Sequence, residues 1–239
     1  MNADKFVQDR NPFLRWLADW NANLRTVPFG AVIEDVNRTA ILSVDLIVGF
    51  AYEGPLSSPR IAGIVPAVAR LFQQADAAGL EHMILLQDCH SEDAPEFSSY
   101  GRHCACGTNE ARTVPELLSL PFTDRFSVML KNSLSSSLGT SLDAWLNAHH
   151  SNVDTFIVVG DCTDLCVYQL AMHLRMRANA YSYRQRVIVP ADCVETYDVP
   201  VDAAATQGVL PHDGDLLHAL FLYHMALNGV EVYASLAAG

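Results

Sequence analysis

Charged and thiol side chains stand at or just after the ends of four apolar runs in this 239-residue sequence. They are Asp45, Asp88, Lys131 and Cys166. A carboxylate and an ammonium group beside a thiol can activate it as a nucleophile, because the carboxylate accepts its proton and the ammonium group stabilises the thiolate. Taken singly, such residues also serve as helix caps, solvent-reaching lysines and small core residues. Their recurrence at the ends of successive runs favours a reactive cluster.

A second group of side chains begins at Asp88 and continues with His90, Glu96 and His103. Carboxylate and imidazole ligands in this mixture suit zinc, iron or manganese, and a set carried by a loop can leave positions open for water or substrate. Asp88 and His90 alternate along the chain, so they point the same way if the strand continues through them. Exposed polar residues without a metal are the alternative reading of the same pattern.

The elements that must position these groups are visible as six short runs rich in Val, Ile and Leu, separated by segments of helical period. This alternation is typical of an α/β fold with three α/β/α layers and a central six-stranded, mainly parallel sheet. The predicted strands span residues 40–45, 82–87, 127–131, 155–160, 186–190 and 230–234. Ligands of such sheets bind at the carboxyl ends of the strands, where the polar residues above stand.

The intervening segments predict helices, and two other parts of the chain differ from this pattern. The helices are expected over residues 65–75 with an end near Gly79, and over 142–148, 164–178 and 215–228. Residues 88–126 show little periodicity, and so long an irregular stretch in a compact domain usually has a function.

Residues 1–38 are interpreted as an N-terminal arm that packs on its own domain in preference to a subunit interface. One domain follows at residues 39–239.

Composition excludes several classes of partner. The formal net charge of −12 and the pI near 5.0 argue against a nucleic-acid surface, which needs clustered Lys and Arg. The first residues carry charges where a signal peptide needs an apolar core, and the longest apolar stretch, 40–52, is too short to cross a membrane. A cytoplasmic protein is therefore expected. For its six cysteines, free thiols, metal binding or catalysis are favoured over disulfides.

The order of the motifs resembles the isochorismatase-like cysteine hydrolase superfamily: SVD at 43–45, then Lys131, then GDCTDLCV at 160–167, over roughly residues 40–234. The resemblance implies that Cys166 attacks a carboxamide carbon, that Asp45 takes the thiol proton and passes it to the leaving amine, and that Lys131 helps to keep the site ionised. It also implies an oxyanion hole formed by the N–H groups of Cys162 and Cys166, and a cis peptide bond between Asp161 and Cys162.

Within that superfamily the sequence is most similar to the nicotinamidases, because residues fall on the positions of their metal ligands and ring-stacking aromatics. The resemblance implies one divalent metal ion, zinc with iron or manganese as alternatives, held by Asp88, His90, Glu96 and His103. It implies that Phe50 and Tyr100 sandwich the substrate ring, although Tyr100 replaces the usual Trp and Glu96 a common His. Family habit further implies a small-molecule amide substrate and a homo-oligomer.

The leading hypothesis is hydrolysis of nicotinamide to nicotinate and ammonia through a thioester on Cys166. The alternative is a related cysteine amidohydrolase acting on another carboxamide or a carbamoyl or ureido compound, since Ile47 and Cys89 depart from the residues common at their positions. A metallohydrolase with attack by bound water would instead be centred on the metal ligands. Reversible oxidation of Cys162 and Cys166 is a further, less favoured hypothesis.

Overall fold

The structure, a computed structural model, describes residues 2–238, and its centre is a sheet in which every pairing is parallel. Six strands follow one another in the order β4-β3-β2-β5-β6-β8. Their bounds are β2 (Thr39–Val44), β3 (His82–Asp88), β4 (Phe126–Lys131), β5 (Thr155–Asp161), β6 (Arg186–Pro190) and β8 (Glu231–Tyr233). All six predicted strands are present. A seventh, β7 (Val194–Glu195), pairs with the end of β5 and is too short to show any periodicity.

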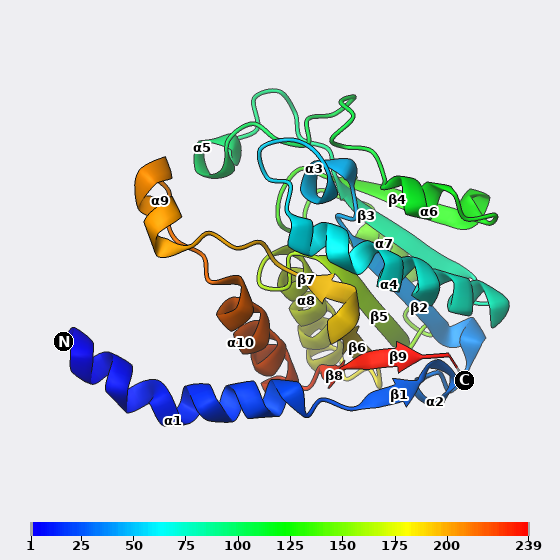
Figure 1. The fold of residues 1–239 in the computed structure, drawn as a ribbon. Helices are drawn as coiled ribbons and strands as arrows, with labels where there is room; N and C mark the ends of the chain where they lie inside the picture. The colour runs from blue at the N-terminus through cyan, green and yellow to red at the C-terminus, as the bar shows by residue number, and fades with distance from the viewer. Residues whose placement is uncertain (1, 239) are drawn as a thin grey trace.

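Helices cover both faces of the sheet, as the α/β/α prediction requires (Figure 1). The longer ones are α1 (Ala3–Ala22), α4 (Pro59–Ala77), α7 (Leu142–His149), α8 (Cys166–Ala180), α9 (Val201–Gln207) and α10 (Gly214–Leu227). Single turns form α2 (Phe29–Val32), α3 (Val48–Ala51), α5 (Phe97–Tyr100) and α6 (Pro115–Leu118), with 3-10 turns η1 (Val36–Arg38), η2 (Thr123–Arg125) and η3 (Ala191–Cys193). The irregular segment between β3 and β4 thus contains only short turns of helix.

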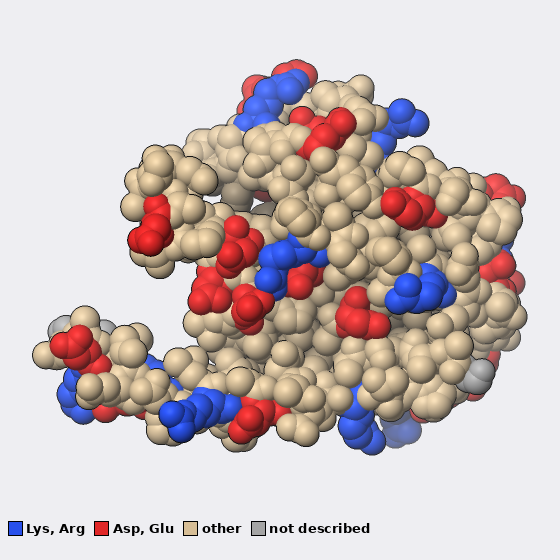
Figure 2. Space-filling view, in the orientation of Figure 1, with Lys and Arg blue, Asp and Glu red and all other residues tan. Residues whose placement is uncertain are grey.

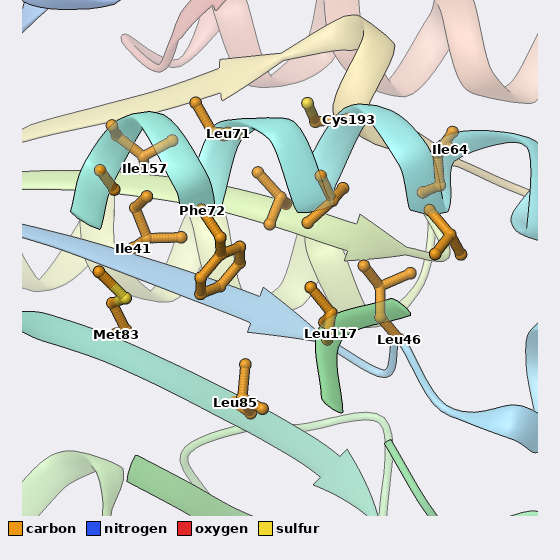
Figure 3. Packing of buried hydrophobic residues seen from close by; sticks show 14 of the residues in the cluster. Ile41, Leu46, Ile64, Leu71, Phe72, Met83, Leu85, Leu117, Ile157 and Cys193 are labelled. Carbon is orange, nitrogen blue, oxygen red and sulfur yellow. The ribbon is translucent and has the colours of Figure 1, made fainter. Parts of the chain in front are cut away.

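Successive residues of a strand belong to two separate hydrophobic cores, because side chains along a strand point alternately to opposite faces. Ile41 and Met83 belong to the core beneath α4, and Figure 3 shows Phe72 of α4 reaching toward their strands. Their neighbours Leu42 and Ile84 belong to the other core, which α7, α8 and α10 cover. Burial on both faces explains why these strands read as continuous apolar runs.

The helix boundaries follow local signals in α4 and depart from the predicted start in α8. The Ser58 side chain accepts a hydrogen bond from the backbone of Arg60 and caps α4, which closes near Gly79 at φ 84° as predicted. The predicted start of α8 at Asp164 was two residues early. Leu165 is not helical, at φ −115° and ψ −101°, so that Cys166 is the first residue of the helix.

The N-terminal arm packs partly on the domain that follows it. Strand β1 (Thr26–Pro28) pairs with β9 (Ser235–Ala237), and Trp16 and Trp20 of α1 contact the Tyr223 ring of α10 at centroid distances of 5.2 and 5.8 Å. The beginning of α1 stands clear of the body in Figure 2 and exposes Phe6 and Val7. Among residues 2–238, no helix has the length and apolarity needed to cross a membrane.

Candidate active site

Strand order brings the predicted catalytic side chains together at one edge of the sheet. Asp45 follows β2, Lys131 ends β4, Cys166 follows β5, and β3 with Asp88 lies between β2 and β4. The Lys131 Nζ atom lies 2.7 Å from Asp45 Oδ2, 2.6 Å from Asp88 Oδ1 and 3.6 Å from Cys166 Sγ. All four residues are at most 5% exposed. The lysine ammonium therefore joins two carboxylates and the thiol in a site shielded from water.

Backbone geometry fixes the Asp45 carboxylate. Asp45 itself adopts φ 55°, its N–H donates to the Leu86 carbonyl oxygen, and its Oδ1 accepts a hydrogen bond from the backbone of Asp88 at 2.8 Å. Beside it, Gly160 at φ 113° lets β5 approach β2 closely, because an added Cβ would lie 1.9 Å from the Val44 carbonyl oxygen. The ends of the two central strands can meet only with glycine at this position.

The two carboxyl groups differ in their affinity for protons. Burial, reinforced by the Asp88 charge, raises the pKa of Asp45 to about 7 despite the opposing influence of Lys131. Burial acts in the same direction on Asp88, but Lys131 and His90 outweigh it and lower the pKa of Asp88. Asp45 is therefore the carboxyl group suited to gain and lose a proton near neutrality.

The ammonium and the thiol also have shifted pKa values. Burial favours a neutral amine, but Asp45, Cys166 and Asp88 together raise the pKa of Lys131 well above its usual range. Burial raises the pKa of the Cys166 thiol, and Lys131 acts against this shift. Cys166 is also the first residue of α8, where the helix dipole favours a thiolate. A buried thiol of this kind needs a nearby base, and Asp45 contacts the same ammonium.

The loop that leads into Cys166 has the expected backbone. The peptide bond between Asp161 and Cys162 is cis, as predicted. The N–H groups of Leu165 and Val167 donate to the Cys162 carbonyl oxygen at 3.0 and 3.1 Å. Among the loop and cap hydrogen bonds of residues 2–238, none uses the N–H group of Cys162 or Cys166. These two N–H groups remain the predicted donors of an oxyanion hole.

A second cluster of buried side chains lies beside the first and shares Asp88 with it. Potential ligand atoms of Asp88, His90 and His103 all lie within 4.8 Å of one another. Nδ1 of His90 is 3.1 Å from Asn132 Oδ1, and Nδ1 of His103 is 2.8 Å from the Gly101 carbonyl oxygen. Each ring is thus held by its Nδ1 and presents Nε2, which is the usual arrangement around a metal. In the described chain, His90 Nε2 has no hydrogen-bond partner.

The remaining predicted ligand, Glu96, lies outside this group of three. It is the half-buried residue that precedes α5, on the irregular segment between β3 and β4. The three grouped residues fit a cation well, since one carboxylate and two fixed imidazoles converge in a buried space. The structure gives Glu96 no comparable position, so its role as a ligand stays a prediction.

Aromatic rings surround His103. The ring centroids of Phe50 and Tyr100 lie 5.8 and 6.3 Å from the His103 ring, which places both predicted stacking residues beside the cluster. A third ring, Phe97, lies 5.6 Å from His103 and 5.5 Å from His90. Sequence reasoning missed both Phe97 and the His90 partner Asn132. Their positions directly after Glu96 and Lys131 were the available signals.

The preference for free thiols was wrong for two cysteines, because Cys89 and Cys106 form a disulfide. The chain segments around His90 and Cys106 lie side by side. The His90 N–H donates to the Cys104 carbonyl oxygen, and the Cys106 N–H donates to the His90 carbonyl oxygen. This pairing brings the Cα atoms of Cys89 and Cys106 to 4.5 Å across a sequence separation of 17. The bond closes the loop that contains His103 and Tyr100. Cys104, Cys162, Cys166 and Cys193 are free and buried.

The chain is an α/β protein whose parallel sheet has a buried cluster of two carboxyl groups, an ammonium group and a thiol at one edge, and the family comparison agrees with this arrangement. The isochorismatase domain family matches residues 39–216, so the chain belongs to that family. One curated relative is nicotinamidase 1 of Arabidopsis thaliana, which is 28% identical over 158 residues. That match covers 63% of this chain and 64% of the relative, less than two thirds of its length.

Solved structures confirm the fold. N-carbamoylsarcosine amidase from Thermoplasma acidophilum matches with a TM-score of 0.61 and 23% identity, over 82% of this chain and 95% of that one. A pyrazinamidase of Pyrococcus horikoshii in complex with zinc matches with a TM-score of 0.62 and 20% identity, over 82% and 98%. At these identities the similarity shows a shared fold, and the substrate must be argued from the site.

Proposed function

We propose that this protein is a cysteine-dependent amidase that hydrolyses a small-molecule carboxamide, with nicotinamide as the leading substrate. The observation that carries the proposal is the buried Lys131 ammonium, which contacts Asp45, Asp88 and the Cys166 thiol together. A thiol beside a base and a fixed positive charge is suited to nucleophilic attack on a carbonyl carbon. Amidases among the relatives support the same class of reaction.

The proposed reaction has two halves. Cys166 Sγ attacks the carbonyl carbon while Asp45 accepts the thiol proton, and the N–H groups of Cys162 and Cys166 stabilise the oxyanion. The C–N bond then breaks, and Asp45 passes the proton to the leaving nitrogen, which departs as ammonia. Water attacks the resulting thioester, Asp45 takes a proton from it, and the acid leaves as the thiol reforms. Lys131 stays protonated throughout and offsets the negative charge.

We further propose that Asp88, His90 and His103 hold one divalent metal ion, zinc in the first instance, with Glu96 as the fourth ligand. The Nε2 of His90, which lies 3.4 Å from Asp88 Oδ2 without forming a hydrogen bond, and the fixed Nδ1 atoms support this assignment, as does the pyrazinamidase relative in complex with zinc. When bound, the metal would supply a Lewis-acid position for a polar substrate atom. The protein residues around it would orient the substrate toward Cys166.

The aromatic surroundings favour a flat heteroaromatic substrate. Phe50, Phe97 and Tyr100 all lie near His103, where apolar ring faces can contact a pyridine or pyrazine ring. The nicotinamidase relative supports nicotinamide within this class. A homo-oligomer remains part of the proposal, and the exposed Phe6 and Val7 on α1 are consistent with it.

Purified, zinc-loaded protein is expected to release ammonia from nicotinamide and pyrazinamide faster than from an N-carbamoyl amino acid, because only the aromatic amides can stack on these rings. The measurement is coupled ammonia detection with each substrate at matched concentrations. Turnover of the carbamoyl compound alone would exclude nicotinamide and retain the amidase class. Folded, zinc-loaded protein that hydrolyses none of the three would contradict the substrate proposal.

Substituting His103→Ala is expected to weaken zinc binding by more than about 100-fold, because a metal ligand is lost from a three-residue group. Zinc content after dialysis against a graded chelator series measures the effect without any use of activity. His150→Ala is the matched control, since this exposed histidine donates only to the nearby Asn147 carbonyl oxygen. Equal zinc retention in His103→Ala and wild type would refute the assignment of this ligand.

A further inference from the structure

The loop that carries the nucleophile is held by one segment from the C-terminal part of the chain, residues 195–218. The Thr163 N–H donates to the Glu195 carbonyl oxygen at 2.9 Å, and Thr163 Oγ1 lies 2.9 Å from His218 Nδ1. Asp164 Oδ2 lies 2.8 Å from His212 Nε2. Both loop side chains therefore depend on groups more than thirty residues further along the chain.

His212 is fixed on every side. Its Nε2 faces Asp164, its Nδ1 lies 2.9 Å from the Tyr197 carbonyl oxygen, and its ring stacks on the Tyr197 ring at 3.8 Å and 20°. Its backbone N–H and carbonyl oxygen both pair with Val199, at 2.9 and 2.7 Å. The residue is 8% exposed. The imidazole has no freedom to turn away from Asp164.

The hydrogen-bond geometry holds both nitrogens of this ring. A carbonyl oxygen can only accept a hydrogen bond, so Nδ1 donates to Tyr197. Nε2 then faces the Asp164 carboxyl group, and the two residues are each less than 10% exposed. A buried ring held at both nitrogens therefore fixes the position of Asp164.

The residues that precede His212 in the chain are buried against the rest of the protein at few positions. Residues 200–211, which include α9, are mostly exposed, with Leu210 at 88%, and Figure 1 shows α9 standing out from the body. Few apolar contacts fix this stretch against the active-site loop. The polar contact between His212 and Asp164 therefore links the end of the protruding stretch to the loop of the nucleophile, beside the contacts of Thr163 with Glu195 and His218.

We propose that His212 is a positioning residue for Cys166 and acts through Asp164. Asp164 precedes Cys166 by two residues, and the intervening Leu165 is not part of the helix. A shift of Asp164 would therefore move Cys166 Sγ away from Lys131, at present 3.6 Å distant. This inference rests on the proposed function only in taking Cys166 as the nucleophile, and it holds for any amide substrate.

Substituting His212→Gln removes the imidazole ring that joins Asp164 to the Tyr197 carbonyl oxygen. The rate at which iodoacetamide alkylates Cys166 is expected to fall about 10- to 100-fold, and kcat on the amide that the ammonia assay identifies by a similar factor with KM little changed, because a small misplacement of a reacting group has effects of this size. Mass spectrometry of the Cys166 peptide gives the alkylation rate without any amide substrate. The control His150→Gln is expected to match wild type in both measurements.

A contact that merely supports the fold would give a different result in a double-substitution experiment. Adding Asp164→Asn to His212→Gln is expected to slow alkylation little beyond either single change, because the two act as one unit. Multiplied losses would overturn the proposal.

The same experiments separate this proposal from the broader one. If no amide is hydrolysed but His212→Gln still slows alkylation, the positioning role stands and the substrate proposal fails. If wild-type Cys166 resists alkylation altogether, the assignment of the nucleophile fails and the positioning role with it. Should His212→Gln not fold, His212→Arg supplies a side chain able to donate to Asp164, and it is expected to keep an alkylation rate within about 10-fold of wild type. A larger loss in folded His212→Arg would contradict the proposal.

Discussion

Replacing Cys166 with alanine is expected to lower kcat for amide hydrolysis by at least about 10⁴-fold, because the proposed reaction then lacks the atom that forms the thioester. The substitution removes one sulfur from a site whose other contacts persist, since Lys131 stays paired with Asp45 and Asp88. Zinc content and the unfolding midpoint are expected to stay near the wild-type values. Single-turnover measurements of ammonia release, with mass spectrometry for the acyl-enzyme, give the result directly.

A matched control is available in another buried free thiol. Cys193 is 3% exposed and belongs to the core beneath α4, so Cys193→Ala removes an equally buried sulfur from a different environment. It is expected to keep full catalytic activity. Substantial hydrolysis by Cys166→Ala would contradict the thioester mechanism and favour direct attack by water. Loss of activity in both variants would show that the effect reflects packing in general.

The strands were predictable because burial on both faces of the sheet requires a continuous run of apolar residues in the sequence. Ile41 and Leu42 point to opposite cores, and both must be apolar, so the run is continuous. The order of the strands in the sheet has no such pattern, since the periodicity within one apolar run does not show which strands lie beside it. The places of Asp45, Lys131 and Cys166 at strand ends indicated a reactive cluster, and the resemblance to a family supported it. The contact between Lys131 and Asp88 was not predicted.

The irregular segment between β3 and β4 was the least predictable part of the site. Cys89 and Cys106 meet because His90 pairs with the backbone of residues 104 and 106, and such isolated pairings lack any repeating pattern. The position of Phe97 depends on the same chain path. The contact between His212 and Asp164 was missed for a similar reason, because the two residues lie 48 positions apart and the segment between them shows no motif.

Replacing Lys131 with methionine is expected to lower the free energy of unfolding by about 3–5 kcal/mol and to abolish hydrolysis. Methionine fits the buried space, but it leaves the Asp45 and Asp88 carboxylates without the cation that both contact at 2.7 and 2.6 Å. Breaking a buried ion pair by removing one partner has an effect of this size, because a charge is left unpaired away from water. Urea unfolding of metal-free protein measures the loss.

The pH dependence of that loss provides a further test of the cause. In the wild type, burial and Asp88 already raise the pKa of Asp45 to about 7, and without Lys131 it rises further. A carboxyl group whose pKa is higher in the folded than in the unfolded state stabilises the fold at low pH, and this contribution disappears as the pH rises through the folded-state value. The stability difference between Lys131→Met and wild type is therefore expected to be smaller at pH 5 than at pH 8.

The control is Asp45→Asn, which keeps Lys131 paired with Asp88 and leaves no carboxylate unpaired. It is expected to abolish hydrolysis, because the base is lost, with a much smaller effect on stability than Lys131→Met. Equal destabilisation by the two variants would mean that packing around the charged groups matters more than their pairing. Stability independent of pH in Lys131→Met would contradict the electrostatic explanation, since it would show that the buried carboxyl groups do not change protonation on unfolding.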